Sequence, residues 1–289
     1  NSNLRTSNPQ NNMSAFVSVK DQKSGKTILG AEDGVNQSYC DLLFYVDATP
    51  GSSIDDPERP SIPDEGDKEE PKPDEDENVT GTLAFEDIWP SGGDYDMNDV
   101  IVEYERKVYF DKKNIVTKIV DEFTPVHDGA TYVNAFAYQI DAAQIGDKIT
   151  LPEGAILEKE TSSIIVMSNA KQNIGNKYVV TREFNGSFLK NQLLSYNPYI
   201  IVKYSQGEQN RTEVHLPKHK ATAYANQSLI GSNDDAYYID RKGAYPFAID
   251  IPMLGFTPVT ERNRIDSQYP GFATWAKSMG NDCKDWYKK

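Results

Sequence analysis

The sequence predicts an all-β protein, an antiparallel β-sandwich or jelly-roll-like fold with one short C-terminal helix. Short runs in which apolar and polar residues alternate recur along the chain, and tyrosine, valine, isoleucine and threonine are plentiful. A two-residue alternation is typical of half-buried strands, and these residue types favour the pleated conformation. Long stretches with the 3.6-residue period of a helix are nearly absent. Short strands separated by frequent turn residues favour a sandwich or jelly-roll.

Composition divides the 289 residues into three predicted segments. Residues 1–50 are an N-terminal β segment, interpreted as the remnant or partner of an upstream domain. Residues 51–79 are an acidic, proline-rich linker, since residues 51–78 hold twelve Asp or Glu against three Lys or Arg. Such a segment buries too little apolar surface to offset its ordering entropy, although a long surface loop is the alternative. Residues 80–289 form the predicted β-sandwich domain.

Strands are predicted wherever alternating runs lie between turn residues. In the N-terminal segment these runs are 15–19, 26–31 and 42–46. In the sandwich domain they are 82–85, 100–110, 114–124, 131–140, 149–151, 163–167, 199–204, 213–216, 237–239 and 247–251. One helix is predicted over 267–279, because aromatic and apolar residues repeat there at three and four, and Gly280 would end it.

The most informative stretch is residues 85–104, where an acidic, glycine-containing loop runs directly into an alternating apolar run. Its candidate metal ligands are Glu86, Asp87, Asp94, Asp96, Asn98 and Asp99. Carboxylates about 4 Å apart repel each other by several kcal/mol at a protein surface. Hard oxygen ligands on a flexible loop are what Ca²⁺ prefers. We therefore predict that these six residues hold calcium.

The acidic loop has two other interpretations, a solvated turn and an EF-hand. A solvated turn stays open, because Asp, Asn and Gly are ordinary turn residues. An EF-hand is excluded, because its sixth position, a glycine in that motif, would be Asp99 here. The β-branched run Val100–Val102 also predicts a strand where the EF-hand needs a helix.

A shorter acidic segment with a similar pattern, which we call the echo, occurs upstream. Glu32, Asp33 and Asp41 precede an apolar run, as Glu86, Asp87 and Asp99 do. The echo is interpreted as a weaker second metal site, a relic of a repeat, or chance similarity.

Charge and composition exclude several classes of function. The net charge of −14 disfavours nucleic acid and anionic membrane as partners. No run of eighteen apolar residues is present to span a membrane. The chain begins at Asn1 without a secretion signal, as expected of a processed chain or one trimmed at that point. Cys40 and Cys283 are far apart in sequence and are predicted to be free, partly buried thiols.

Other candidate sites are weaker. His215 and His219 are spaced as zinc ligands on a helix would be, but Pro217 between them argues against a helix, and His127 is assigned to a turn. Residues 231–235 form a second acidic loop, interpreted as a plain turn or as a flap that closes the calcium site. No nucleophile elbow, metalloprotease motif or phosphate-binding glycine loop is present.

Several of these motifs together resemble the LruC-domain, DUF4842-like family of exported surface proteins from bacteria, mainly Bacteroidetes. The resemblance covers about residues 80–289 and rests on Leu83–Asp87, Trp89-Pro90, Asp94–Val100, His215–Pro217, Tyr245–Ile249, Tyr269–Ala276 and Asp285–Tyr287. It implies a β-rich protein that is exported to the periplasm or the cell surface, often as a lipoprotein anchored to the outer membrane. It implies no established activity, and it adds location and architecture more than chemistry; calcium is predicted from the residues of the acidic loop alone.

Three hypotheses of function follow. The first is a calcium-stabilised surface module, non-catalytic, that binds a glycan or another surface component or has a structural role. The second is a hydrolase acting on glycan or peptide with structural calcium, for which no acid–base or nucleophile motif is found. The third is a subunit of a surface polymer, in which the strands of residues 1–50 pair with another chain. The oligomeric state is open.

Overall fold

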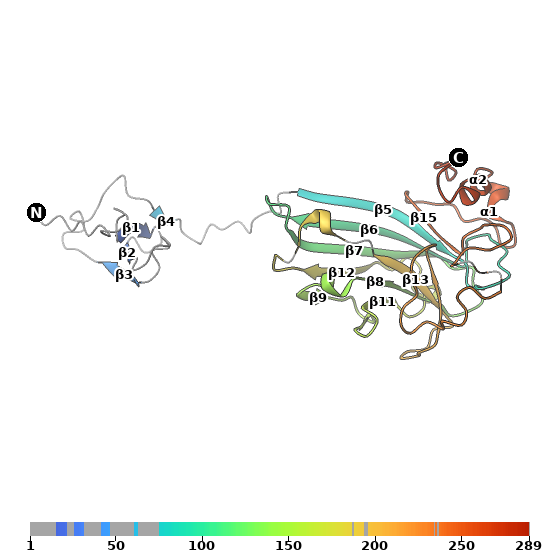
Figure 1. The fold of residues 1–289 in the computed structure, drawn as a ribbon, viewed down its shortest axis with the longest axis horizontal. Coiled ribbons are helices and arrows are strands. Elements are labelled where there is room, and N and C mark those ends of the chain that lie inside the picture. Colours follow the sequence, from blue (N-terminus) through green and yellow to red (C-terminus); the bar gives the residue numbers. More distant parts are fainter. Residues whose placement is uncertain are drawn as a thin grey trace, which may run out of the picture. The chain divides into compact units, whose positions relative to one another are not determined.

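The computed structural model describes residues 16–21, 26–31, 42–46, 61–62 and 75–288, apart from 187, 194, 195, 234 and 236 (Figure 1). The chain forms two compact units, residues 1–72 and 73–289. The predicted echo residues Glu32, Asp33 and Asp41, and Cys40, lie outside the described residues. The division into 1–50, 51–79 and 80–289 stays a prediction.

The first unit contains a four-stranded sheet in the order β3-β2-β1-β4. Its strands are β1 (Phe16–Asp21), β2 (Thr27–Ala31), β3 (Leu42–Val46) and β4 (Ser61–Ile62). The first three pair antiparallel and lie where alternation predicted strands, whereas β4 pairs in parallel with β1 and lies within the predicted linker.

The second unit is a sandwich of two antiparallel sheets, which confirms the predicted fold class (Figure 1). The six-stranded sheet has the order β15-β5-β6-β7-β12-β9. Its strands are β5 (Glu75–Phe85), β6 (Val100–Phe110), β7 (Val116–His127), β9 (Lys148–Thr150), β12 (Tyr178–Glu183) and β15 (Ala248–Ile251). The five-stranded sheet has the order β10-β11-β8-β13-β14. Its strands are β8 (Ala135–Gln139), β10 (Ile156–Glu158), β11 (Ser163–Met167), β13 (Asn197–Val202) and β14 (Thr212–His215).

Alternation along the strands sorts side chains between two cores. Val100 and Val102 of β6 pack in the main core with Phe136 of β8 and Ile200 of β13, between the sheets. Ile101, between the two valines, faces the opposite side and joins a second core built with the C-terminal segment. Both faces of β6 are therefore buried at the end of the strand that follows the acidic loop.

The prediction of one continuous C-terminal helix is wrong. Two short helices, α1 (Ile265–Gln268) and α2 (Phe272–Lys277), replace it. Pro270 lies between them, and a proline lacks the amide donor and disfavours helical geometry in the residue before it. Tyr269 accordingly has φ −124° and ψ 80°. The aromatic residues still form a core, as expected, because Tyr269, Phe272 and Trp286 pack against one another.

Other elements differ from the sequence-based expectation. Residues 237–239 are not a strand, because Tyr237 and Tyr238 have φ of 70° and 63°. Strands β10 and β12 were not predicted. Strand β5 begins at Glu75, within the predicted linker, because Glu75–Asn78 continue the ladder opposite the far half of β6. Cys283 is free as predicted but exposed, not partly buried. Among the described residues, no helix has the length and apolar character needed to cross a membrane.

Candidate functional site

The acidic loop is held at both ends by the sheet. It connects β5 to β6, and these strands pair Phe85 with Val100, so the first and last residues of the loop are neighbours. Glu86 and Asp87 therefore lie beside Asp99, although they are far apart in the loop sequence. The Asp87 N–H donates to Asp99 Oδ2 at 2.8 Å.

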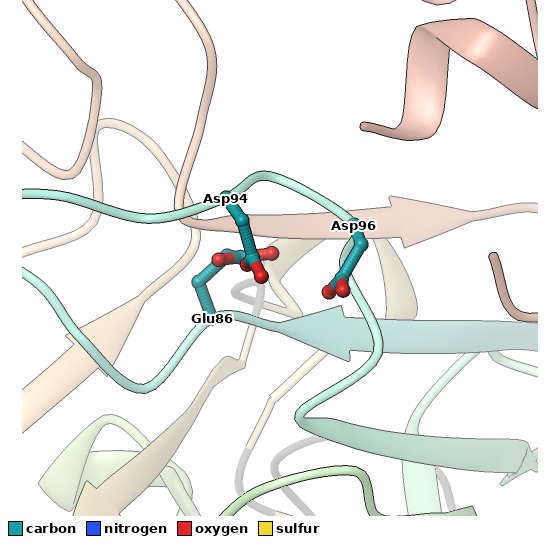
Figure 2. Close-up of side chains that lie close together, drawn as sticks. All are labelled: Glu86, Asp94 and Asp96. Carbon is teal, nitrogen blue, oxygen red and sulfur yellow. The ribbon is translucent and has the colours of Figure 1, made fainter. Parts of the chain in front are cut away.

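The middle of the loop is curled by two residues with left-handed backbone. Tyr95 and Met97 have φ of 58° and 55°, values that non-glycine residues rarely adopt. Packing holds both of them: Met97 is fully buried in the C-terminal core, and the Tyr95 ring lies 5.6 Å from Tyr245 and from Phe247. Asp94 and Asp96 alternate with Tyr95 and Met97 along the loop, and their side chains lie on the side of Glu86 (Figure 2).

Three carboxylates converge at this point, those of Glu86, Asp94 and Asp96. One oxygen atom from each lies within 4.8 Å of the other two (Figure 2). Glu86 is fully buried; its Oε1 accepts the Met97 N–H at 2.6 Å, and its Oε2 has no hydrogen-bond partner. Asp96 is also buried and accepts the Arg262 N–H at 2.9 Å, whereas Asp94 is partly exposed. We call these three residues the carboxylate trio.

The carboxylates of the loop are in an environment that favours binding of protons or of a cation. Burial, followed by the neighbouring charge of Asp99, raises the pKa of Glu86 well above its ordinary value. Burial and Asp94 raise the pKa of Asp96 to about 6. Burial and Asp87 raise the pKa of Asp99 to about 7. In each case a buried negative charge is penalised both by lost hydration and by its neighbours.

The remaining three predicted ligands lie beside the trio and make other contacts. Asp87 accepts the side-chain amide of Asn134 at 2.8 Å. Asn98 is buried; its amide donates to the Val259 carbonyl at 2.9 Å, and its Oδ1 has no hydrogen-bond partner. The structure thus brings together the ligand atoms of three of the six predicted residues, with Asp87, Asn98 and Asp99 adjacent.

Sequence reasoning missed Asp128. It follows the last residue of β7, and β7 pairs His127 with Ile101, so Asp128 lies next to the end of the acidic loop. Its side chain is fully buried and forms an ion pair with Lys171, whose Nζ lies 3.7 Å from Oδ1, and the Ala130 N–H also lies close enough to stabilise the carboxylate. Burial raises its pKa to about 6. The sequence marks residues 126–129 only as a turn, because the register between β6 and β7 cannot be read from it.

The other sequence candidates have structural roles. Asp235 is fully buried and accepts the Trp89 indole N–H at 3.0 Å and the Gly231 N–H at 2.7 Å, so its carboxylate fixes its own turn to Trp89. His215 is buried in β14, with Nε2 3.0 Å from Glu213 and Nδ1 2.8 Å from Asn197.

Comparison with known proteins adds the following. The model of a family described as a domain of unknown function (DUF4842) matches residues 114–287. A crystal structure described as a putative lipoprotein from Bacteroides ovatus is similar, with a TM-score of 0.55, 18% sequence identity and 74% of each chain covered. At that identity the similarity concerns the fold. No curated protein sequence matches this chain.

Proposed function

The chain belongs to the DUF4842 family, and from that premise we propose that it is an exported surface protein whose acidic loop is fixed by calcium. In this proposal the sandwich is a non-catalytic module that binds a glycan or a surface component, or has a structural role. The calcium ion organises the module and takes no part in a reaction.

The observation that carries the proposal is the unpartnered oxygen of Glu86. A buried carboxylate oxygen with no hydrogen-bond donor costs on the order of 1–3 kcal/mol or more, and here Oε2 lies with two further carboxylates. A cation bound to all three would replace the missing donors and remove the mutual repulsion. A solvated turn would not need to bury Glu86 completely.

The donor set favours calcium over other metals. Every ligand of the carboxylate trio is a hard oxygen, and no histidine or cysteine belongs to it. Ca²⁺ accepts six to eight oxygens at 2.3–2.6 Å in adaptable geometry, whereas Mg²⁺ demands near-ideal octahedral geometry at about 2.0–2.1 Å. Zinc sites use nitrogen and sulfur far more often. Main-chain carbonyls and water would complete the shell.

The bound ion would lock the loop onto the sandwich. Because calcium would bind the folded state only, it adds stability that grows with the logarithm of free calcium over its dissociation constant. Extracellular modules bind calcium at about 10⁻⁴–10⁻³ M. A protein of that affinity is loaded outside the cell and empty in the cytosol, which suits an exported protein. The protein of similar fold from Bacteroides ovatus, described as a putative lipoprotein, supports a surface location.

A thermal melt of the full chain tests the proposal. We expect a rise in melting temperature from chelator to millimolar Ca²⁺, with a much smaller rise in equal Mg²⁺. Equal shifts with both ions would indicate general screening of the acidic surface. No shift with either ion would contradict the calcium site.

A further inference from the structure

We propose that a groove beside strand β15 and helix α2 binds a ring-sized unit of a neutral glycan. A cavity of about 270 Å³ lies there, lined by β15 and the residues before it, by the end of α2 and by the segment that follows β14. The inference rests on the proposed function and deepens it, because it gives the glycan-binding alternative a site and a ligand class. None of its residues belongs to the carboxylate trio.

The lining of the groove is mostly apolar. It comes from three separate parts of the chain, namely Leu216, Pro246 with Ala248, and Trp275 with Met279. Met279 is 64% exposed and Trp275 is half-buried, so both side chains are accessible. An apolar cavity with a few polar side chains is the usual form of a small-molecule site, with a volume of about 300–1,000 Å³. The cavity found here is at the small end of that range and suits one ring-sized unit of ligand.

The indole of Trp275 is a fixed platform in this groove. Its ring lies 5.5 Å from Phe272 and 5.5 Å from Trp286, and both of these are buried in the C-terminal core. Its Nε1 makes no hydrogen bond to the residues that the structure describes. A ring that is packed against the core and also lines the groove suits the apolar C–H face of a sugar, and its N–H remains available to a hydroxyl.

Asp250 of β15 supplies an oriented acceptor. The Tyr104 hydroxyl donates to its carboxylate, at 3.1 Å from Oδ1 and 3.3 Å from Oδ2. Within the described part of the chain, Asp250 has no other hydrogen bond through its side chain and no ion pair. Each carboxylate oxygen has two lone pairs, so a single hydroxyl leaves most of this capacity unused. Burial raises the pKa of Asp250, as expected of a carboxylate that lacks donors.

Lys218 and His219 complete the groove and define the ligand class. Both line the cavity, and neither side chain forms a hydrogen bond or ion pair with another described residue. Because Lys218 and Asp250 carry opposite charges and are not paired, a ligand with net charge of either sign meets one like charge. A sugar hydroxyl both donates and accepts, so a neutral sugar suits both groups. An apolar peptide side chain would leave Asp250 without donors.

A glycan array probed with the full chain is the first test. We expect neutral oligosaccharides to be retained, and sialylated or sulfated forms of the same core to gain nothing. The strongest neutral oligosaccharide is then titrated into the protein, with calorimetry for affinity and tryptophan emission for location. The other two tryptophans, Trp89 and Trp286, are buried, so the change in emission should come from Trp275. Retention of no neutral oligosaccharide, retention of charged ones alone, or binding without a change in emission would overturn the inference.

Two variants and a matched control assign the binding to the groove. Asp250→Asn should weaken it at least about tenfold, because a charged acceptor is lost. Trp275→Phe keeps an aromatic ring but removes the N–H donor, and should weaken binding about fivefold. Glu153→Gln makes the same carboxylate-to-amide change in an exposed turn outside the groove and should leave the affinity unchanged. Unchanged affinity in both groove variants, or equal weakening in all three variants, would show that the groove is not the site.

Melting temperatures separate binding from folding, and the glycan site from the calcium site. Asp250→Asn should not lower the melting temperature, because burial already disfavours the charge that it removes. If it lowers the melting temperature and leaves the affinity of the folded protein unchanged, Asp250 is structural and the inference fails. A calcium-dependent rise in melting temperature without glycan binding would contradict this inference alone. Glycan binding without that rise would contradict the calcium site alone.

Discussion

The absent side chain of Gly93 makes room for Glu86. A Cβ atom on residue 93 would lie 2.8 Å from Glu86 Oε2, closer than real Cβ contacts allow. Glu86 is fully buried and held through its other oxygen by the Met97 N–H, so it cannot swing away freely. We expect Gly93→Ala to displace this carboxylate and weaken calcium binding at least about tenfold, or about 1.4 kcal/mol. A calorimetric titration with calcium measures the change in affinity.

Gly92 is the matched control for this substitution. A Cβ there meets nothing within 4 Å, but its φ of +84° strains any other residue. Gly92→Ala should therefore cost about 1–2 kcal/mol of stability, equally with and without calcium. If the two alanine variants lose the same calcium affinity, the clash with Glu86 is not the cause.

Substitutions of Asp94 and of Asp96 should change the melting temperature in different ways. Asp94 is partly exposed, and no hydrogen bond to its carboxylate is found in the described part of the chain. Asp94→Asn should abolish the calcium-dependent rise in melting temperature, and in chelator it should raise the melting temperature slightly, because it removes a charge that repels Glu86 and Asp96. Asp96 also accepts the Arg262 N–H, so Asp96→Ala should in addition lose about 1 kcal/mol in chelator. Equal losses in both conditions for Asp94→Asn would contradict a metal role.

Strands were predicted correctly from sequence where the local pattern of residue types alone decides the structure. Strands β6 and β11 lie at the predicted residues, because β-branched and aromatic residues alternate or cluster between clear turns. The prediction failed where tertiary contacts or a single residue decide. Pro270 divided an otherwise periodic helix, and the positive φ of Tyr237 and Tyr238 excluded a strand that residue type favoured.

The candidate site was predictable only in part, for a similar reason. Glu86, Asp94 and Asp96 were found because they lie in one short loop, where spacing carries information. The burial of Glu86 could not be read from sequence, since it depends on Met97 packing into the C-terminal core. Asp128 is contributed by the register of another strand pair, which a single sequence does not encode locally.

A buried ionic cluster on the sheet predicts the acid sensitivity of the fold. Asp121 contacts Arg106, Arg182 at 3.3 Å and the Tyr138 hydroxyl at 3.1 Å, all of them buried. Burial alone would raise the pKa of Asp121, but the two arginines outweigh it and hold the pKa below its ordinary value. Its stabilising contribution is therefore complete above the unfolded pKa of about 3.9 and is lost as the pH falls below that value.

Replacing Asp121 tests this cluster. Asp121→Asn leaves two buried arginines without their carboxylate and should cost about 3–5 kcal/mol near pH 7. The difference from the wild type should begin to shrink below about pH 4, where Asp121 becomes protonated in the unfolded chain while the folded state still holds it ionised. Urea unfolding at pH 7 and at pH 3 gives both values. A difference that stays constant between these pH values would mean that Asp121 does not titrate with unfolding.

The C-terminal core should couple to the acidic loop, and two phenylalanines can separate this coupling from general destabilisation. Phe272 packs in the core that also contains Met97, and the adjoining segment binds the loop through Ile265 N–H to the Tyr95 carbonyl at 2.7 Å. Phe184 lies in a separate core with Val108 and Ile119. Either residue changed to alanine should cost about 3–5 kcal/mol. Only Phe272→Ala should also weaken calcium binding, because it loosens the support of Met97 and hence of Glu86. Calcium affinity measured by calorimetry, at a temperature where both variants remain folded, distinguishes them; equal affinities would show that the loop is held without the C-terminal core.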